Sequence, residues 1–109
     1  MNNVLHGRGA STGIGVGQSK VIPSGERVQV DAPDTVLVME MTTPEIMPHI
    51  RKLAAIVTQI GGVTCHAAII AREYNIPTVV ACKDAYRIPD GVTVIVNADK
   101  GTVEFSYGL

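Results

Sequence analysis

The sequence predicts a small mixed α/β domain with about seven strands and two helices. With 109 residues the chain is near the common size of one domain, so we expect a single domain over residues 1–109. Hydrophobic residues make up 46%, but there is no Trp and only one Phe, so the core must be aliphatic, and its Val and Ile favour sheet. Between residues 35 and 81 predicted strands alternate with predicted helices, which is typical of a parallel β-α-β-α-β unit.

The first third of the chain is predicted to form strands and turns. Residues 7–17 are too rich in glycine for a helix, and a strand is expected over 17–22, ending at Pro23-Ser24-Gly25. Polar and apolar residues alternate over 27–30, which predicts a half-buried strand. The more continuous apolar run 35–39 predicts a buried one.

A helix is predicted over 44–53, because Thr precedes Pro at a favourable first helical position. Glu45 either completes a capping box with Thr42 or lies in the first turn, where a carboxylate is favoured. Pro48 lies inside this segment, so its first turn should be irregular or the regular helix should begin near Met47.

The second half of the chain continues the alternation of strands and helices. A strand at 55–58 and a turn at Gly61-Gly62 precede a helix predicted over 66–74, with Asn75 as its left-handed cap. The segments at the two ends of the chain are expected to be antiparallel or hairpin strands. The remaining strands are expected at 78–81, 92–96 and 102–105.

Composition excludes several classes of protein. Nine basic and ten acidic residues are interspersed, with no basic stripe, so nucleic acid is not an expected partner. No apolar run approaches the roughly 18 residues of a membrane span, and the first residues lack the core of a signal peptide, so we expect a cytoplasmic protein with no membrane partner. Cys65 and Cys82 lie in apolar surroundings, where a disulfide is possible but not needed.

The candidate functional residues lie between Gly61 and Arg72. The double glycine lets the backbone turn sharply into a helix whose first turn carries the imidazole of His66. The first amides of a helix have no internal partners and lie at the positive end of the dipole, which favours an anion. A neutral imidazole nitrogen is nucleophilic, and a phosphoryl group on it would lie near those amides and the Thr64 hydroxyl. Thr64 would then orient either the ring or the phosphate.

The string GGVTCHAAIIAREYNIP resembles the active-site signature of the phosphohistidine, or swivelling, domain of phosphoenolpyruvate-utilising enzymes. This family includes phosphoenolpyruvate synthase (pyruvate, water dikinase), pyruvate phosphate dikinase and enzyme I of the sugar phosphotransferase system. Thr64-Cys65-His66 is most similar to the synthase form. The resemblance covers nearly the whole chain, since it extends to residues 9–14, Thr42-Thr43-Pro44, residues 55–58 and Asp90-Gly91.

The resemblance implies a three-layer β/β/α swivelling architecture and a phosphoryl-carrier role for His66. Thr64 matches a family position beside the phosphohistidine, and Cys65 belongs to the same signature with a less defined role. There are two departures. Val63 stands where synthases usually carry Arg, and Thr43 stands where they often carry Asp.

The resemblance also implies partners. His66 would relay phosphate between ATP and pyruvate/phosphoenolpyruvate sites on a nucleotide-grasp ATP-binding domain and a phosphoenolpyruvate/pyruvate-binding barrel. ATP and Mg²⁺ are expected on those partner domains, and no cofactor or metal is expected on this chain. The chain should be an excised domain or a stand-alone carrier, and its start at Met1 favours a separate gene product.

Other interpretations are weaker. A structural or regulatory module, such as the similar C-terminal extension of some pyruvate kinases, is the main alternative, and the full Thr-Cys-His sequence argues against it. A catalytic pair of Cys65 and His66 is disfavoured because neighbours in a helix point about 100° apart. Cys65, His66, Cys82 and His49 lack the paired spacing of a metal site, and no phosphate-binding glycine motif is present.

Overall fold

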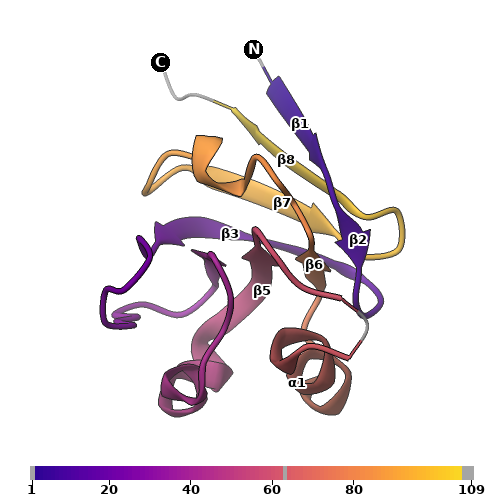
Figure 1. Ribbon diagram of the computed structural model, residues 1–109. Coiled ribbons are helices and arrows are strands. Elements are labelled where there is room, and N and C mark those ends of the chain that lie inside the picture. Colours follow the sequence, from indigo (N-terminus) through magenta and orange to yellow (C-terminus); the bar gives the residue numbers. More distant parts are fainter. Residues whose placement is uncertain (1, 63, 107–109) are drawn as a thin grey trace.

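A computed structural model describes residues 2–62 and 64–106. The mixed α/β fold predicted from the sequence is confirmed (Figure 1). The strands are β1 (Asn2–His6), β2 (Arg8–Gly9), β3 (Ile14–Val21), β4 (Thr35–Met39), β5 (Leu53–Thr58), β6 (Thr78–Val80), β7 (Thr93–Asn97) and β8 (Thr102–Ser106). The helices are the α-helix α1 (His66–Tyr74) and the 3₁₀ helices η1 (Pro44–Lys52) and η2 (Ala85–Arg87).

One curled sheet organises the chain, with strand order β1-β8-β7-β3-β4-β5-β6-β2. Strands β3 to β6 run parallel to one another, whereas β1, β8, β7 and β3 pair antiparallel, as does β2 with β6. Only Gly7 separates β1 from β2, although these strands lie at opposite ends of the order. The sheet therefore curls until its ends meet, and the Gly7 amide donates to the Gly101 carbonyl at 2.9 Å.

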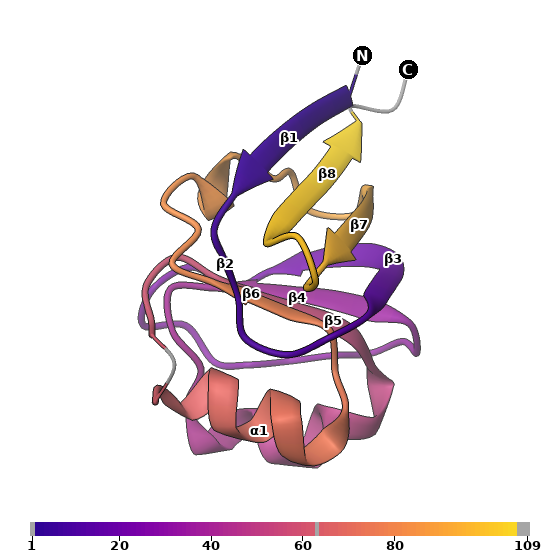
Figure 2. The same ribbon diagram turned by 90° about the vertical axis from the view of Figure 1, so that its right-hand side faces the viewer.

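Two hydrophobic cores lie on the two sides of β4, whose five residues are all buried. Alternate side chains of a strand point to opposite faces, so Val36 and Val38 enter one core and Leu37 and Met39 the other. The first core joins β4 and β5 to the antiparallel half of the sheet, and includes Val94, Val96, Val103 and Phe105. The second joins them to η1 and α1, which cover this face (Figure 2), and includes Ile46, Ile50 and Ile70.

The carboxyl ends of β4, β5 and β6 meet at one edge of the sheet. Beyond the strands, the Ile60 amide donates to the Glu40 carbonyl and the Cys82 amide to the Thr58 carbonyl, each at 3.0 Å. Because α1 follows β5, its first residue lies at this same edge.

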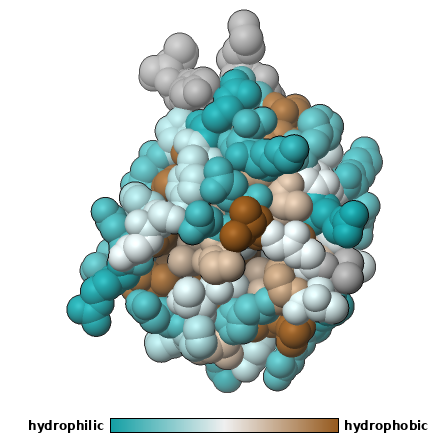
Figure 3. Space-filling view, in the orientation of Figure 1, coloured by the Kyte–Doolittle hydropathy of each residue, from teal (hydrophilic) through white to brown (hydrophobic). Residues whose placement is uncertain are grey.

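The surface is predominantly polar on the face shown in Figure 3, where hydrophobic side chains lie singly or in small groups among hydrophilic ones. No helix in the described part of the chain has both the length and the apolar character needed to cross a bilayer.

Elements that neighbouring residues specify lie where they were predicted, with differences in one helix type and one strand end. Helix α1 covers 66–74 as expected, and Asn75 has the left-handed conformation of a C-cap, with φ 56° and ψ 45°. Residues 44–52 are helical, but as 3₁₀ rather than α-helix. Strand β6 ends at Val80 because Ala81 is left-handed, with φ 53°.

The structure differs from other expectations. Residues 27–30 form no strand, because Val30 packs into the helix-side core without a neighbouring strand. Of the two alternatives for Glu45, the place in the first helical turn is confirmed, whereas the capping box with Thr42 is not formed and the Thr42 hydroxyl bonds to His66. Strand β3 begins at Ile14 rather than Gly17, and β1 and β2 were not expected at all.

Candidate functional site

His66 is the first residue of α1, with Cys65 as its N-cap. The first helical hydrogen bond runs from the Ile69 amide to the Cys65 carbonyl at 3.1 Å, so the amides of residues 66–68 precede the helical ladder. Helical side chains tilt toward the N-terminus, which holds the imidazole of His66 beside those amides. The ring therefore lies at the positive end of the helix dipole.

One nitrogen of the His66 ring is held by Thr42. The Thr42 Oγ1 and His66 Nδ1 atoms are 2.9 Å apart, and Thr42 is only 7% exposed. Thr42 follows β4, whereas His66 follows β5, so the convergence of the two strand ends brings the pair together. A ring nitrogen engaged in this way leaves Nε2 as the other reactive atom of the imidazole. The sequence pattern indicated only a helix-capping role for Thr42, as one of two alternatives, and this contact was not predicted.

A small hollow of about 120 Å³ lies at the ring. Ligand pockets for nucleotides and drug-sized molecules usually measure roughly 300–1,000 Å³, so this hollow suits a group no larger than a phosphoryl group. Residues from the three adjacent segments form its wall: Met41, Thr42, Ile60, Gly61, Cys65, His66 and Ala67.

Gly61 is required by the local geometry of this hollow. Its φ of 145° is rarely adopted by L residues, and an added Cβ would lie 3.0 Å from Cys65 Sγ and 3.2 Å from Val80 Cβ. At Gly62 an added Cβ would meet nothing within 4 Å. The first glycine of the pair therefore makes the turn, and the second has no steric requirement.

The other predicted site residues differ in their surroundings. The Thr64 side chain is exposed, and within residues 2–62 and 64–106 the ring of His66 is bonded by Thr42 rather than by Thr64. Cys65 is a free, half-buried cysteine whose side chain does not cap the helix. Val63 lies outside the described residues. Thr43 is the N-cap of η1, and its buried Oγ1 has no hydrogen-bond partner among the described groups.

Cys82 is separate from this site in character. It is a free thiol with no exposed surface, in the core between the two halves of the sheet. Burial, followed by the charge of Asp84, raises the pKa of Cys82 from 9.0 to about 11. Cys82 is therefore a packing residue with little nucleophilic character near neutral pH.

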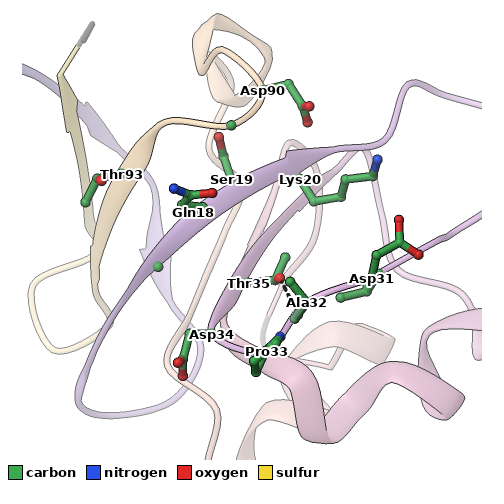
Figure 4. Close-up of a pocket in the computed structure, with 13 residues that line it drawn as sticks. Gln18, Ser19, Lys20, Asp31, Ala32, Pro33, Asp34, Thr35, Asp90 and Thr93 are labelled. Atoms are coloured by element: carbon green, nitrogen blue, oxygen red, sulfur yellow. Dashed lines mark hydrogen bonds between the residues drawn. The ribbon is translucent and has the colours of Figure 1, made fainter.

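A second hollow, of about 420 Å³, lies at the amino end of β4, which is the opposite end from Thr42 (Figure 4). Several of its polar groups form hydrogen bonds that hold the surrounding loops in place. Thr35 Oγ1 donates to the Ala32 carbonyl, Ser19 Oγ donates to the Pro89 carbonyl, and an Asp90 carboxylate oxygen accepts from the Val21 amide. These contacts engage Thr35, Ser19 and Asp90 within the fold, and none of them involves His66.

The chain matches the family model described as "PEP-utilising enzyme, mobile domain" over residues 30–101. It is 46% identical over 92% of its length to a probable phosphoenolpyruvate synthase of Archaeoglobus fulgidus, and 45% identical over 95% to the phosphoenolpyruvate synthase of Escherichia coli. The chain spans only 13% of the length of each of these relatives.

A solved structure of an Enzyme I protein is also similar. It aligns with a TM-score of 0.60 and 27% identity, over 72% of this chain and 33% of that one.

Proposed function

Because the chain belongs to the family of the mobile domain of phosphoenolpyruvate-utilising enzymes, we propose that His66 is transiently phosphorylated and relays the group between two other sites. The observation that carries this proposal is the engagement of His66 Nδ1 by Thr42 at the start of α1. A histidine held at one nitrogen, beside unpartnered helix amides, is prepared to carry an anion on the other nitrogen.

In the proposed step, Nδ1–H donates to Thr42 Oγ1 and the lone pair of Nε2 attacks phosphorus in line. The N–P bond forms as the P–O bond to the donor breaks, and the donor oxygen leaves with the bonding electrons. The Nδ1 proton stays on the ring, where its bond to Thr42 Oγ1 stabilises the positive charge that develops. The reverse sequence delivers the phosphoryl group to an acceptor.

The phosphoryl oxygens would be bound by the amides of residues 66–68. These groups are fixed by the helix and need no rearrangement when charge arrives, which is the form of stabilisation that favours phosphoryl transfer. We assign the exposed Thr64 hydroxyl to the same oxygens rather than to the ring, since Thr42 already engages the ring. Cys65 would shape the hollow as one of the residues that form its wall.

The donor and the acceptor would bind elsewhere. The hollow of about 120 Å³ at His66 is too small for a nucleotide, and the synthases matched by this chain are far longer than it. We propose ATP and Mg²⁺ on a nucleotide-grasp partner domain, and pyruvate or phosphoenolpyruvate on a barrel partner domain, in the same or separate chains.

Apolar side chains near the ring fit such transfer between domains. Met41, Ile60 and Ile69 are about half exposed, at 50%, 45% and 51%, and the first two line the hollow at His66. A partner that covered them would exclude water, which strengthens the electrostatic contacts and protects the N–P bond from hydrolysis.

The test is labelling of the chain by ³²P-phosphoenolpyruvate in the presence of the E. coli synthase, or by β-labelled ATP with the same enzyme. The phosphorylated chain is separated from the much longer synthase by size. We expect acid-labile, alkali-stable label that is absent in His66→Ala. His49→Ala is the matched control, because His49 is partly exposed on η1, and it should keep the label. A ³¹P spectrum should assign the label to Nε2.

Two outcomes would contradict the proposal. Label that persists in His66→Ala would move the phosphoryl group to another residue. A chain that stays unlabelled with both donors would favour a structural or regulatory module.

A further inference from the structure

A cationic hollow lies beside the edge that carries His66. It measures about 470 Å³, and its lining includes Arg8 of β2, Lys83 after β6 and Arg87 of η2. All three side chains are exposed, and among the described residues none of them has an ion-pair partner. The hollow also holds one carboxylate, that of Asp84, and the exposed ring of His6. Three permanent positive charges thus face one negative charge.

The hollow and the candidate site lie at the ends of neighbouring strands. Arg8 pairs with Val80 at the end of β6, and the Gln59 side-chain amide donates to the Lys83 carbonyl at 3.2 Å. Gln59 immediately precedes Ile60, which lines the hollow at His66. Neighbouring strands lie about 4.8 Å apart, so two strand spacings, or about 10 Å, separate β5 from β2.

The distance between these strands determines which charged side chains lie near a docked partner. Exposed charges act on each other over a Debye length of about 8 Å at physiological ionic strength. A macromolecule that covers His66 and extends along this edge by two strand spacings would bring its surface to Arg8, Lys83 and Arg87.

We propose that this cationic hollow is a docking surface for an acidic surface on the partner domain that exchanges a phosphoryl group with His66. The proposal rests on the proposed function of His66 and adds the chemistry of the partner. The cations are exposed, come from two segments that are distant in the sequence, and line an open hollow. Such an arrangement speeds association with an oppositely charged protein surface, whereas capture of a small anion needs buried, hydrogen-bonded groups.

The test compares two double variants with the same change in net charge. Lys83→Glu/Arg87→Glu reverses two charges of the hollow. The control, Arg27→Glu/Arg51→Glu, reverses two exposed charges before β4 and at the end of η1. Each variant is titrated against the E. coli synthase with ³²P-phosphoenolpyruvate over a range of KCl concentrations.

We expect the wild-type second-order labelling rate to fall as salt rises. Reversal in the hollow should lower this rate by about tenfold or more at low salt and flatten the salt dependence, while the control changes it less than about twofold. The rate at saturating synthase should stay near the wild-type value for both. Lys83→Gln/Arg87→Gln should give an intermediate rate. Equal effects of the hollow and control reversals would overturn the proposal.

Binding of the fluorescently labelled chain to the synthase, followed by anisotropy, separates this proposal from the function of His66. Salt-sensitive binding that depends on Lys83 and Arg87, without labelling of His66, would refute the carrier function and support the docking surface. Labelling of His66 at a rate independent of Lys83 and Arg87 would support the carrier function and refute the docking surface. Absence of both binding and labelling would refute both.

Discussion

Replacing Thr42 by Val tests how the His66 ring is prepared for phosphorylation. The change removes Oγ1, which lies 2.9 Å from His66 Nδ1, and nearly keeps the side-chain volume. Thr42 is 7% exposed, so water is a poor replacement for the lost hydroxyl. A hydrogen bond of this kind contributes about 0.5–1.5 kcal/mol. If this energy stabilises the Nδ1–H tautomer, in which Nε2 is free to react, its loss should lower the labelling rate at saturating donor by roughly twofold to tenfold.

Two readouts distinguish positioning of the ring from a general loss of stability. The ring ¹⁵N shifts should indicate a protonated Nδ1 in the wild type and a shift toward Nε2–H in Thr42→Val. Thr42→Ser, which keeps the hydroxyl, should restore both the shifts and the rate.

Thr35→Val is the matched control for this experiment. Thr35 is also 7% exposed, and its Oγ1 donates to the Ala32 carbonyl at the far end of β4. It should lose similar stability without a change in ring tautomer. A wild-type ring with unprotonated Nδ1, or equal slowing by both valine variants, would refute the reasoning.

Three further predictions concern the surroundings of the site. Gly61→Ala should lower the free energy of unfolding in urea by about 1–3 kcal/mol, because a side chain is then forced to adopt the φ of 145° and to press against Cys65 Sγ. The control Gly62→Ala should change this free energy by less than about 0.5 kcal/mol. At pH 8, Ellman's reagent should modify half-exposed Cys65 at least about a hundredfold faster than buried Cys82. Cys65→Ser should abolish the fast phase, and comparable rates for the two thiols would contradict the burial of Cys82. The folded chain keeps the Cys82 proton up to a pKa of about 11, whereas the unfolded chain releases it near 9.0, so the free energy of unfolding should fall as pH rises through this window. Burial also raises the pKa of Tyr86, which acts in the same direction, and Cys82→Ala should make the fall shallower without removing it.

Features encoded by neighbouring residues could be predicted from the sequence. Helix α1 has the expected bounds because a glycine turn precedes it and Asn75 can adopt the left-handed conformation that ends it. Four of the five residues in the run 35–39 are apolar because both faces of β4 are covered, and this property is visible in the sequence itself.

Features that depend on distant residues could not be predicted. Thr42 satisfies the rules for a helix cap, yet its hydroxyl bonds to a ring 24 positions along the chain. Strand β1 is defined by its pairing with β8, at the other end of the chain. Residues 27–30 alternate like a strand, but burial of Val30 against the helix-side core produces the same pattern without a ladder.

The positions of glycine in β3 also depend on residues that are distant in the sequence. Added Cβ atoms at Gly15 and Gly17 would lie 2.2 Å from the Ala54 carbonyl and 2.0 Å from the Asp34 carbonyl. The prediction that the glycine-rich segment forms no helix was correct. The extension of the strand to Ile14 depends on the close approach of this segment to other parts of the chain, which its own residues do not reveal.

The burial of β4 on both faces has a consequence for amide hydrogen exchange. Its amides should exchange only through global unfolding, whereas edge strand β1 can open in smaller fluctuations. Thr42, which bonds to the ring of His66, follows this strand by three residues. The edge strand should therefore open to solvent many times for each opening that breaks the contact between Thr42 and the His66 ring.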